Sequence, residues 1–277
     1  MRLGLFLFLL LQSHLGWCFE TPSFLYSSSD IKKLFSIGEN RQIYRWNLRN
    51  LELEKTKPNQ AFCAFEDFGG GDCHTRRFLS YQAARKFLFG YLHLQNDAGG
   101  YYIKCVYCNT EYHETEFGSQ PPAPDAIPDP RVINTEHTWP QSRFSKKASK
   151  DLQKSDLHAL FTTTPRANTS RSNLEFGRVS LVESRPCEDS QRGQEKHKHV
   201  FEPPDSHKGN VARALFYFSM RYHLKISPRE EETLRIWNQL DPVDEDELWR
   251  NDEIEKYQGN RNPFIDHPEA VSLIQDF

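Results

Sequence analysis

Glu136-His137-Thr138-Trp139-Pro140 is the stretch of the chain that says most about its fold and chemistry, because it sets a carboxylate beside an imidazole. If residues 132–136 form a short extended run, the side chains of Glu136 and His137 project to opposite sides of that strand. One of them can then hold a metal ion while the other reaches a water molecule. A polar segment, residues 168–173, follows later in the chain and adds amide and guanidinium groups.

These residue types fit the metal-assisted hydrolysis of a phosphodiester. Hard divalent cations prefer oxygen ligands, and both Glu136 and Asn168 offer oxygen. The reaction also needs a base that takes a proton from water near neutral pH, and an imidazole has an unperturbed pKa of about 6.5. We therefore expect His137 to be the base, and Glu136 and Asn168 to be metal ligands.

Positive charge is concentrated around this candidate site, although the whole chain carries a formal net charge of -3. The net charge argues against a chain that coats nucleic acid indiscriminately. Basic residues nevertheless lie just after the pentad and beside Asn168, which suits a phosphate backbone that passes the site. The candidates for nucleic-acid contact are Arg143, Lys146, Lys147 and Arg166. The alternative interpretation of the lysine-rich run is a solvated helix face.

The N-terminus has the features of a secretory signal. The chain of 277 residues is 37% hydrophobic, enough to bury the core of one large domain or two small ones. Residues 1–18 contain one arginine and an apolar run that is too short to span a bilayer, so we interpret them as a signal peptide; the alternative is a buried N-terminal helix. We expect a secreted or periplasmic protein that has no membrane segment in its mature form and is a monomer.

Cysteine usage agrees with export but does not fix the pairing. Loss of residues 1–18 removes Cys18 and leaves five of the six cysteines, an odd number in a chain expected to meet an oxidising compartment. Cys63 and Cys73 would close a glycine-rich loop. Cys105 and Cys108 form a CxxC arrangement, for which a redox or zinc site is conceivable. The partner of Cys187 stays open.

Helical patterns dominate the later part of the chain. Ser80 can cap a helix that reaches about Leu92, with a core-facing side made of Ala84, Phe87, Leu88 and Tyr91. Further helices are expected from Asn210, from Ser227-Pro228 and over residues 244–257.

The middle of the chain has a different pattern. A strand is expected over residues 101–108, a proline-rich surface loop over 121–130 and an exposed insertion over 186–207. The order of elements predicts an α+β fold, a mostly helical single domain around a small β-sheet.

A longer series of motifs begins with the pentad. In chain order, the motifs are Glu136-His137-Thr138-Trp139-Pro140-Gln141-Ser142, Asp156-Leu157-His158, Asn168, Arg171-Ser172-Asn173, Phe176-Gly177, Gly209-Asn210-Val211-Ala212-Arg213-Ala214, Asp241-Pro242-Val243 and Gln258-Gly259-Asn260-Arg261-Asn262-Pro263-Phe264-Ile265-Asp266. Together, and in matching order from about Leu79 to Glu269, they closely resemble the endonuclease I family of secreted bacterial nucleases. This family belongs to the His-Me finger, or ββα-metal, group.

The resemblance implies a nuclease domain over residues 79–277 with a ββα-metal active site, and it leaves residues 19–78 as an N-terminal extension of unknown role. It implies that His137 is the general base and that Glu136 and Asn168 hold a single Mg²⁺ or another divalent cation. The implied activity is sequence-nonspecific hydrolysis of DNA, with RNA as a further candidate substrate, which leaves 5′-phosphate products.

Two other positions bear on the expected activity. Arg171 is a candidate for a charge-assisted contact with the scissile or an adjacent phosphate; the alternative is a surface arginine without a catalytic role. Ala159 stands where many members of the family have His or Asn, so a polar group near the ligands is expected to be missing. Such a loss weakens metal affinity or activity by ~10 to 100-fold. His158 either compensates for it or satisfies a buried hydrogen bond.

Two functions of other classes are compatible with the sequence. A noncatalytic nucleic-acid-binding protein that retains the fold would tolerate His137→Ala, whereas a nuclease should lose ~10² to 10⁴-fold in rate. A metal-dependent phosphodiesterase for small molecules would need a closed pocket rather than an open basic groove.

Overall fold

The computed structural model describes residues 43–47, 52–56 and 77–277. Strand β1 (Ile43–Asn47) pairs with β2 (Glu52–Thr56) in antiparallel fashion. The predicted signal peptide, most of the N-terminal extension and the predicted Cys63–Cys73 pairing lie outside the described residues. They remain predictions.

The first helix of the domain begins where its capping residue predicts. The Ser80 side chain accepts a hydrogen bond from the backbone N–H of Ala83 at the start of α2 (Tyr81–Phe87). The helix then widens into a π-helical turn, η2 (Leu88–Leu92), in which the N–H of His93 bonds to the carbonyl of Leu88. The wider turn rotates the later residues relative to an α-helical register. Leu88 and Leu92 are therefore buried, whereas Tyr91, predicted to face the core, is 47% exposed.

The next three strands form an antiparallel sheet from β3 (Leu94–Asp97), β4 (Gly100–Cys105) and β5 (Thr110–His113). The predicted strand over 101–108 is correct only as far as Cys105, because residues 106–109 turn the chain into β5. A 3-10 turn, η3 (Glu114–Glu116), and the predicted proline-rich loop follow. Gly90 packs against this loop so closely that an added Cβ would lie 2.6 Å from the backbone nitrogen of Asp125.

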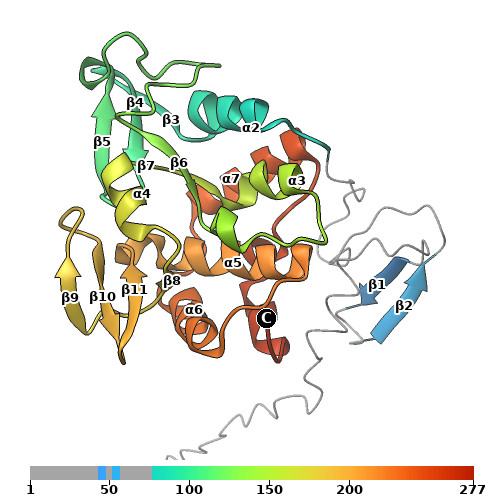
Figure 1. Ribbon diagram of the computed structural model, residues 1–277. Coiled ribbons are helices and arrows are strands. Elements are labelled where there is room, and N and C mark those ends of the chain that lie inside the picture. The colour runs from blue at the N-terminus through green and yellow to red at the C-terminus, as the bar shows by residue number, and fades with distance from the viewer. Residues whose placement is uncertain (1–42, 48–51, 57–76) are drawn as a thin grey trace, which may run out of the picture.

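The pentad lies at the end of a second, two-stranded sheet. Strand β6 (Asn134–His137) pairs antiparallel with β7 (Leu160–Thr163), and Glu136 lies opposite Phe161. The chain between them forms η4 (Gln141–Arg143), α3 (Lys150–Lys154) and η5 (Leu157–Ala159). Directly after β7, Thr164 caps α4 (Pro165–Arg171). Figure 1 shows α4 beside these two strands.

Within residues 186–207, predicted to be an exposed insertion, residues 191–202 form a β-hairpin. Strands β10 (Gln191–Glu195) and β11 (Lys198–Glu202) join β8 (Glu175–Phe176) and β9 (Leu181–Ser184) in the order β8-β11-β10-β9. The prediction was wrong because most side chains of the hairpin are polar and give no apolar alternation. Val200 and Phe201 are fully buried and attach it to the core.

Helices make up the rest of the domain and surround α5 (Lys208–Tyr222), which crosses its middle (Figure 1). A short turn, η6 (Asp205–His207), leads into α5. The predicted starts of the next two helices are confirmed, because Ser227 caps α6 (Pro228–Leu240) and Asp244 caps α7 (Glu245–Gln258). The chain ends with α8 (Pro263–Asp266) and η7 (Pro268–Leu273).

The expectation of a single α+β domain is confirmed, with one change. The strands of residues 77–277 form several small sheets rather than one. Within the described residues, no helix combines the length and the apolar composition that crossing a membrane requires.

Candidate functional site

Glu136 is a buried carboxylate, only 2% exposed, at the end of β6. Its Oε1 atom accepts a hydrogen bond of 2.8 Å from the hydroxyl of Tyr107 and lies 3.3 Å from Nη1 of Arg171. Burial raises the pKa of Glu136 above its usual value, while the Arg171 charge, the Tyr107 hydrogen bond and a hydrogen bond from the backbone N–H of His137 oppose this shift. The other oxygen, Oε2, has no side-chain partner within the described part of the chain.

His137 is 8% exposed, and its two ring nitrogens have different partners. Nε2 lies 3.1 Å from the carbonyl oxygen of Lys154, at the end of α3. A carbonyl oxygen can only accept, so Nε2 carries the proton and Nδ1 of the neutral ring holds the free electron pair. Among the described residues, the hydrogen-bond partner of Nδ1 is the amide of Gln141, at 3.4 Å. Burial lowers the pKa of His137 to about 4, so the ring is neutral at pH 7.

Asn168 extends from α4 toward β6. Its amide nitrogen donates to the side-chain oxygen of Asn134 at 2.9 Å and to the backbone carbonyl of Thr135 at 3.1 Å. These two bonds use both amide protons and fix the orientation of the side chain. The amide oxygen, Oδ1, receives no hydrogen bond from the described residues, so it is available as a ligand on the same element as Arg171.

Arg171 lies beneath the site rather than at its surface, because only 1% of it is exposed. Besides Glu136, its guanidinium contacts the backbone carbonyls of His137, at 3.1 Å, and of Thr138. It also packs over the ring of Phe176. The predicted phosphate contact does not suit this placement, since the guanidinium would have to leave three buried oxygen partners. The alternative of a surface arginine does not describe it either.

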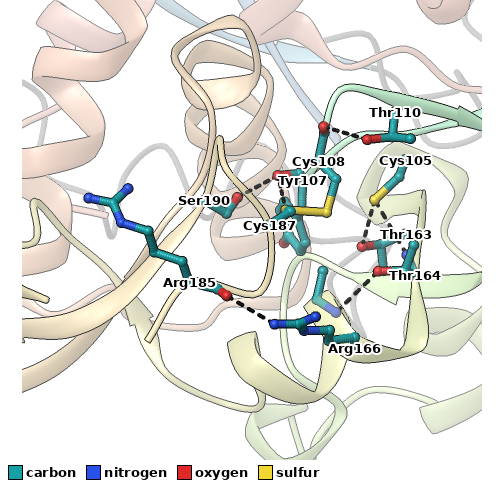
Figure 2. Close-up of a disulfide and its surroundings, with 11 residues drawn as sticks. Cys105, Tyr107, Cys108, Thr110, Thr163, Thr164, Arg166, Arg185, Cys187 and Ser190 are labelled. Carbon is teal, nitrogen blue, oxygen red and sulfur yellow. Dashed lines mark hydrogen bonds between the residues drawn. A yellow bond between two sulfur atoms is a disulfide. The ribbon is translucent and has the colours of Figure 1, made fainter. Parts of the chain in front are cut away.

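The basic residues predicted to contact nucleic acid occupy three different environments. Lys146 and Lys147 are exposed. Arg143 forms an ion pair of 3.1 Å with the buried carboxylate of Glu230, so its charge is already engaged. Arg166 is exposed and bonds to the carbonyl of Arg185 (Figure 2). Because residues two apart on a helix do not share a face, Arg166 and Asn168 lie on different faces of α4.

Comparison with known proteins now assigns the chain to a family, because residues 92–269 match the family described as Endonuclease I. The chain belongs to the endonuclease I family.

Several relatives of this endonuclease I family chain have names that state an activity. An "Extracellular ribonuclease" of Bacillus subtilis (strain 168) is 35% identical over 159 residues, which cover 51% of this chain and 53% of the relative. An "Extracellular deoxyribonuclease" of Aeromonas hydrophila is 31% identical over 111 residues, 40% of this chain and 48% of the relative. An "Endonuclease-1" of Buchnera aphidicola is 35% identical over 112 residues, 40% of this chain and 45% of the relative. The chain thus spans about half the length of these relatives.

Ala159, where the resemblance implies a polar residue, is part of the core. The Ala159 side chain packs in the hydrophobic cluster, and its carbonyl accepts a hydrogen bond from the backbone N–H of Thr138 at 3.0 Å. His158 is directed elsewhere, since its Nε2 bonds to the carbonyl of Asn260 at 2.9 Å and its ring packs against Tyr217. His158 therefore satisfies a buried hydrogen bond instead of replacing a polar group at position 159.

Sequence reasoning missed the partners that hold the candidate ligands and base in place. Tyr107, Asn134 and the carbonyl of Lys154 each contact one of them, yet none forms a local pattern with its partner in the sequence. The structure also gives Cys187 its partner, Cys108. The CxxC interpretation of Cys105 and Cys108 is therefore wrong, and Cys105 is a free, buried thiol.

Proposed function

We propose that this endonuclease I family chain is a secreted or periplasmic nuclease that acts as a monomer and hydrolyses phosphodiester bonds of DNA without sequence specificity, with RNA as a second substrate to be tested. Family membership supports the reaction class. Related proteins named extracellular ribonuclease, extracellular deoxyribonuclease and periplasmic deoxyribonuclease support the substrate class and the location. The observation that carries the proposal is the neutral His137, which follows the buried carboxylate of Glu136 on β6 and whose Nδ1 faces only the exposed amide of Gln141 among the hydrogen-bond partners in the described residues.

The donor atoms of the site fit a hard divalent cation such as Mg²⁺. Glu136 Oε2 and Asn168 Oδ1 are oxygen ligands of the kind that Mg²⁺ prefers, and neither has a side-chain partner in the described residues. When bound, the cation would stabilise negative charge on the phosphate and on the departing 3′ oxygen. Two strands followed by α4 supply these ligands, an order that supports the proposed ββα-metal arrangement.

His137 would accept the proton of the attacking water at Nδ1. The bond from Nε2 to the Lys154 carbonyl fixes the ring and stabilises the imidazolium that forms, because the carbonyl dipole favours the charged ring. Gln141 is exposed, so a water can replace its amide at Nδ1. Attack on phosphorus with departure of the 3′ oxygen leaves a 5′-phosphate product.

The other predicted residues would act at a distance from the reacting atoms. Arg171 would hold Glu136 and the backbone of the pentad rather than touch the phosphate. Lys146 and Lys147 would bind the phosphate backbone, a contact that carries no base information.

Cleavage of supercoiled plasmid by the mature protein tests the proposal, with Mg²⁺, with EDTA and with His137→Ala. We expect Mg²⁺-dependent nicking with 5′-phosphate ends and a loss of ~10² to 10⁴-fold in the variant, because general base catalysis contributes about that much. His199→Ala is the matched control, since His199 lies on β11 and pairs with Glu183. If folded wild-type protein binds metal and DNA without cleaving, a noncatalytic nucleic-acid-binding protein is the better description. Ala159 would then be the first position to test as the cause of the lost activity.

A further inference from the structure

Tyr107 is a fully buried residue in the turn between β4 and β5, far from β6 in the sequence. Its hydroxyl donates the 2.8 Å hydrogen bond to Oε1 of Glu136. Arg171 is the last residue of α4, and its Nη1 atom lies 3.3 Å from the same oxygen. Two donors therefore converge on one oxygen of the carboxylate.

This convergence determines which oxygen of Glu136 remains for a ligand. The last torsion of a glutamate side chain has broad, roughly two-fold preferences, so a carboxylate without partners can rotate freely. Donors on Oε1 fix that rotation and leave Oε2 as the oxygen without a side-chain partner in the described residues. A ligand held in advance binds more tightly, because less freedom is lost when the ion arrives.

The surroundings of Tyr107 hold its own backbone and ring in place. Its carbonyl accepts a hydrogen bond of 2.6 Å from the buried hydroxyl of Ser190, and the next residue, Cys108, is joined to Cys187 (Figure 2). The sulfur of Cys187 lies 3.2 Å from the same carbonyl. The ring packs against Phe201, with 4.9 Å between ring centroids. The loop of residues 187–190 thus fastens the turn that carries Tyr107.

We propose that Tyr107 is a positioning residue for the metal ligand Glu136, and that the Cys108–Cys187 disulfide acts on the metal site by holding Tyr107. This inference rests on the proposed function. The disulfide would then influence metal binding through Tyr107, although neither sulfur contacts Glu136.

Titration of Mn²⁺ into DNA-free protein, followed by the loss of the free-ion EPR signal, tests the inference independently of activity. Tyr107→Phe keeps the ring and removes the hydroxyl, and we expect Mn²⁺ affinity to fall by ~10 to 100-fold, as for other groups that orient a ligand. Tyr112→Phe is the matched control on neighbouring β5, since no hydrogen bond of its hydroxyl occurs in the described structure, and its affinity should equal that of the wild type. Nicking by Tyr107→Phe should recover as the Mg²⁺ concentration is raised.

The disulfide is tested with Cys108→Ser/Cys187→Ser and, as a milder change, Ser190→Ala. We expect both to weaken Mn²⁺ binding, and we expect their effects to add little to that of Tyr107→Phe, because they act through the same side chain. Full additivity would overturn the role of the disulfide.

Two results separate this inference from the proposed function. If Glu136→Ala leaves Mn²⁺ affinity unchanged, the proposed metal site itself is wrong. If Glu136→Ala abolishes binding while folded Tyr107→Phe binds Mn²⁺ as tightly as the wild type, the metal site stands and the positioning role of Tyr107 is overturned.

Discussion

Burial shifts the pKa values of Glu136 and His137, the two residues at the centre of the site. Removal from water disfavours the ionised form of either group, so it raises the pKa of Glu136 and lowers that of His137. For His137 this produces a neutral imidazole at physiological pH, the form that the proposed base requires. For Glu136 the shift opposes the charge that a metal ligand needs, and Arg171 and Tyr107 reduce the cost by stabilising the carboxylate.

Direct titration of His137 in metal-free protein should have a midpoint at about pH 4. The ring is neutral above that value and becomes charged as the pH falls through it, and base catalysis should be lost in the same direction. The Cε1 proton resonance in an NMR titration measures this, with His137→Ala to assign the signal. A midpoint near 6.5, the value of an exposed imidazole, would contradict the buried placement of the ring.

Arg171→Ala should lower the free energy of unfolding by about 3 to 5 kcal/mol, because it leaves the Glu136 carboxylate buried without its charged partner. Urea unfolding of the metal-free protein measures the change. Arg178→Ala is the control, since Arg178 is largely exposed and lies 4.0 Å from Glu195, and its effect should stay within about 0.5 kcal/mol. A variant of Arg171 with normal stability and impaired cleavage would instead support the phosphate contact.

At the scale of elements, local signals were sufficient wherever one residue fixes an end. Ser80, Ser227 and Asp244 each cap the helix that their sequence context predicts. The π-turn after α2 and the polar hairpin of β10 and β11 escaped prediction because packing, rather than an apolar period, selects them. The basic run after the pentad shows the same limit, since only the fold reveals that Arg143 pairs with Glu230.

If the proposed backbone contacts are right, Lys146→Ala/Lys147→Ala should weaken DNA binding by the same factor for every sequence. On duplex DNA, each phosphate contact that is lost should reduce the slope of log K against log salt by about 0.9. Fluorescence anisotropy in EDTA over a range of salt concentrations measures the slope. Lys86→Ala, which removes an exposed lysine that pairs with Asp125 on a different element, should keep the wild-type slope. An unchanged slope in the double variant would place the DNA elsewhere.

At the scale of the molecule, the sequence names Glu136, His137 and Asn168 only as candidates and could not show how distant segments meet. The helix α4 reaches β6 because β7 lies between them in the chain and pairs with β6. Tyr107 and Cys187 belong to other segments, and their contacts depend on the whole domain being folded. Long-range contacts of this kind leave no periodic signal in a single sequence.

The contribution of the buried histidines to stability should decrease as the pH falls below about 6.5, the ordinary pKa of histidine. Burial lowers the pKa values of His93, His137 and His207, the last to about 3, so the unfolded chain binds protons that the folded protein does not. Each such histidine contributes up to about 1.4 kcal/mol per pH unit. Urea unfolding between pH 7 and about 4 measures the free energy of unfolding at each pH. His207→Gln should reduce the slope of this free energy against pH. Equal slopes for the wild type and for His207→Gln would contradict the burial of this ring.

The free thiol of Cys105 has a consequence for recovery after heat. In the folded protein it is buried, and its sulfur lies 3.4 Å from the Thr163 hydroxyl (Figure 2). Unfolding exposes the thiol and lets it reach the Cys108–Cys187 disulfide, and a thiolate attacks a nearby disulfide readily. After this exchange, Cys105 is part of a disulfide, and the native Cys108–Cys187 pair can no longer form. Heat inactivation should therefore become irreversible faster at alkaline pH, where more of the thiol is ionised, than at mildly acidic pH.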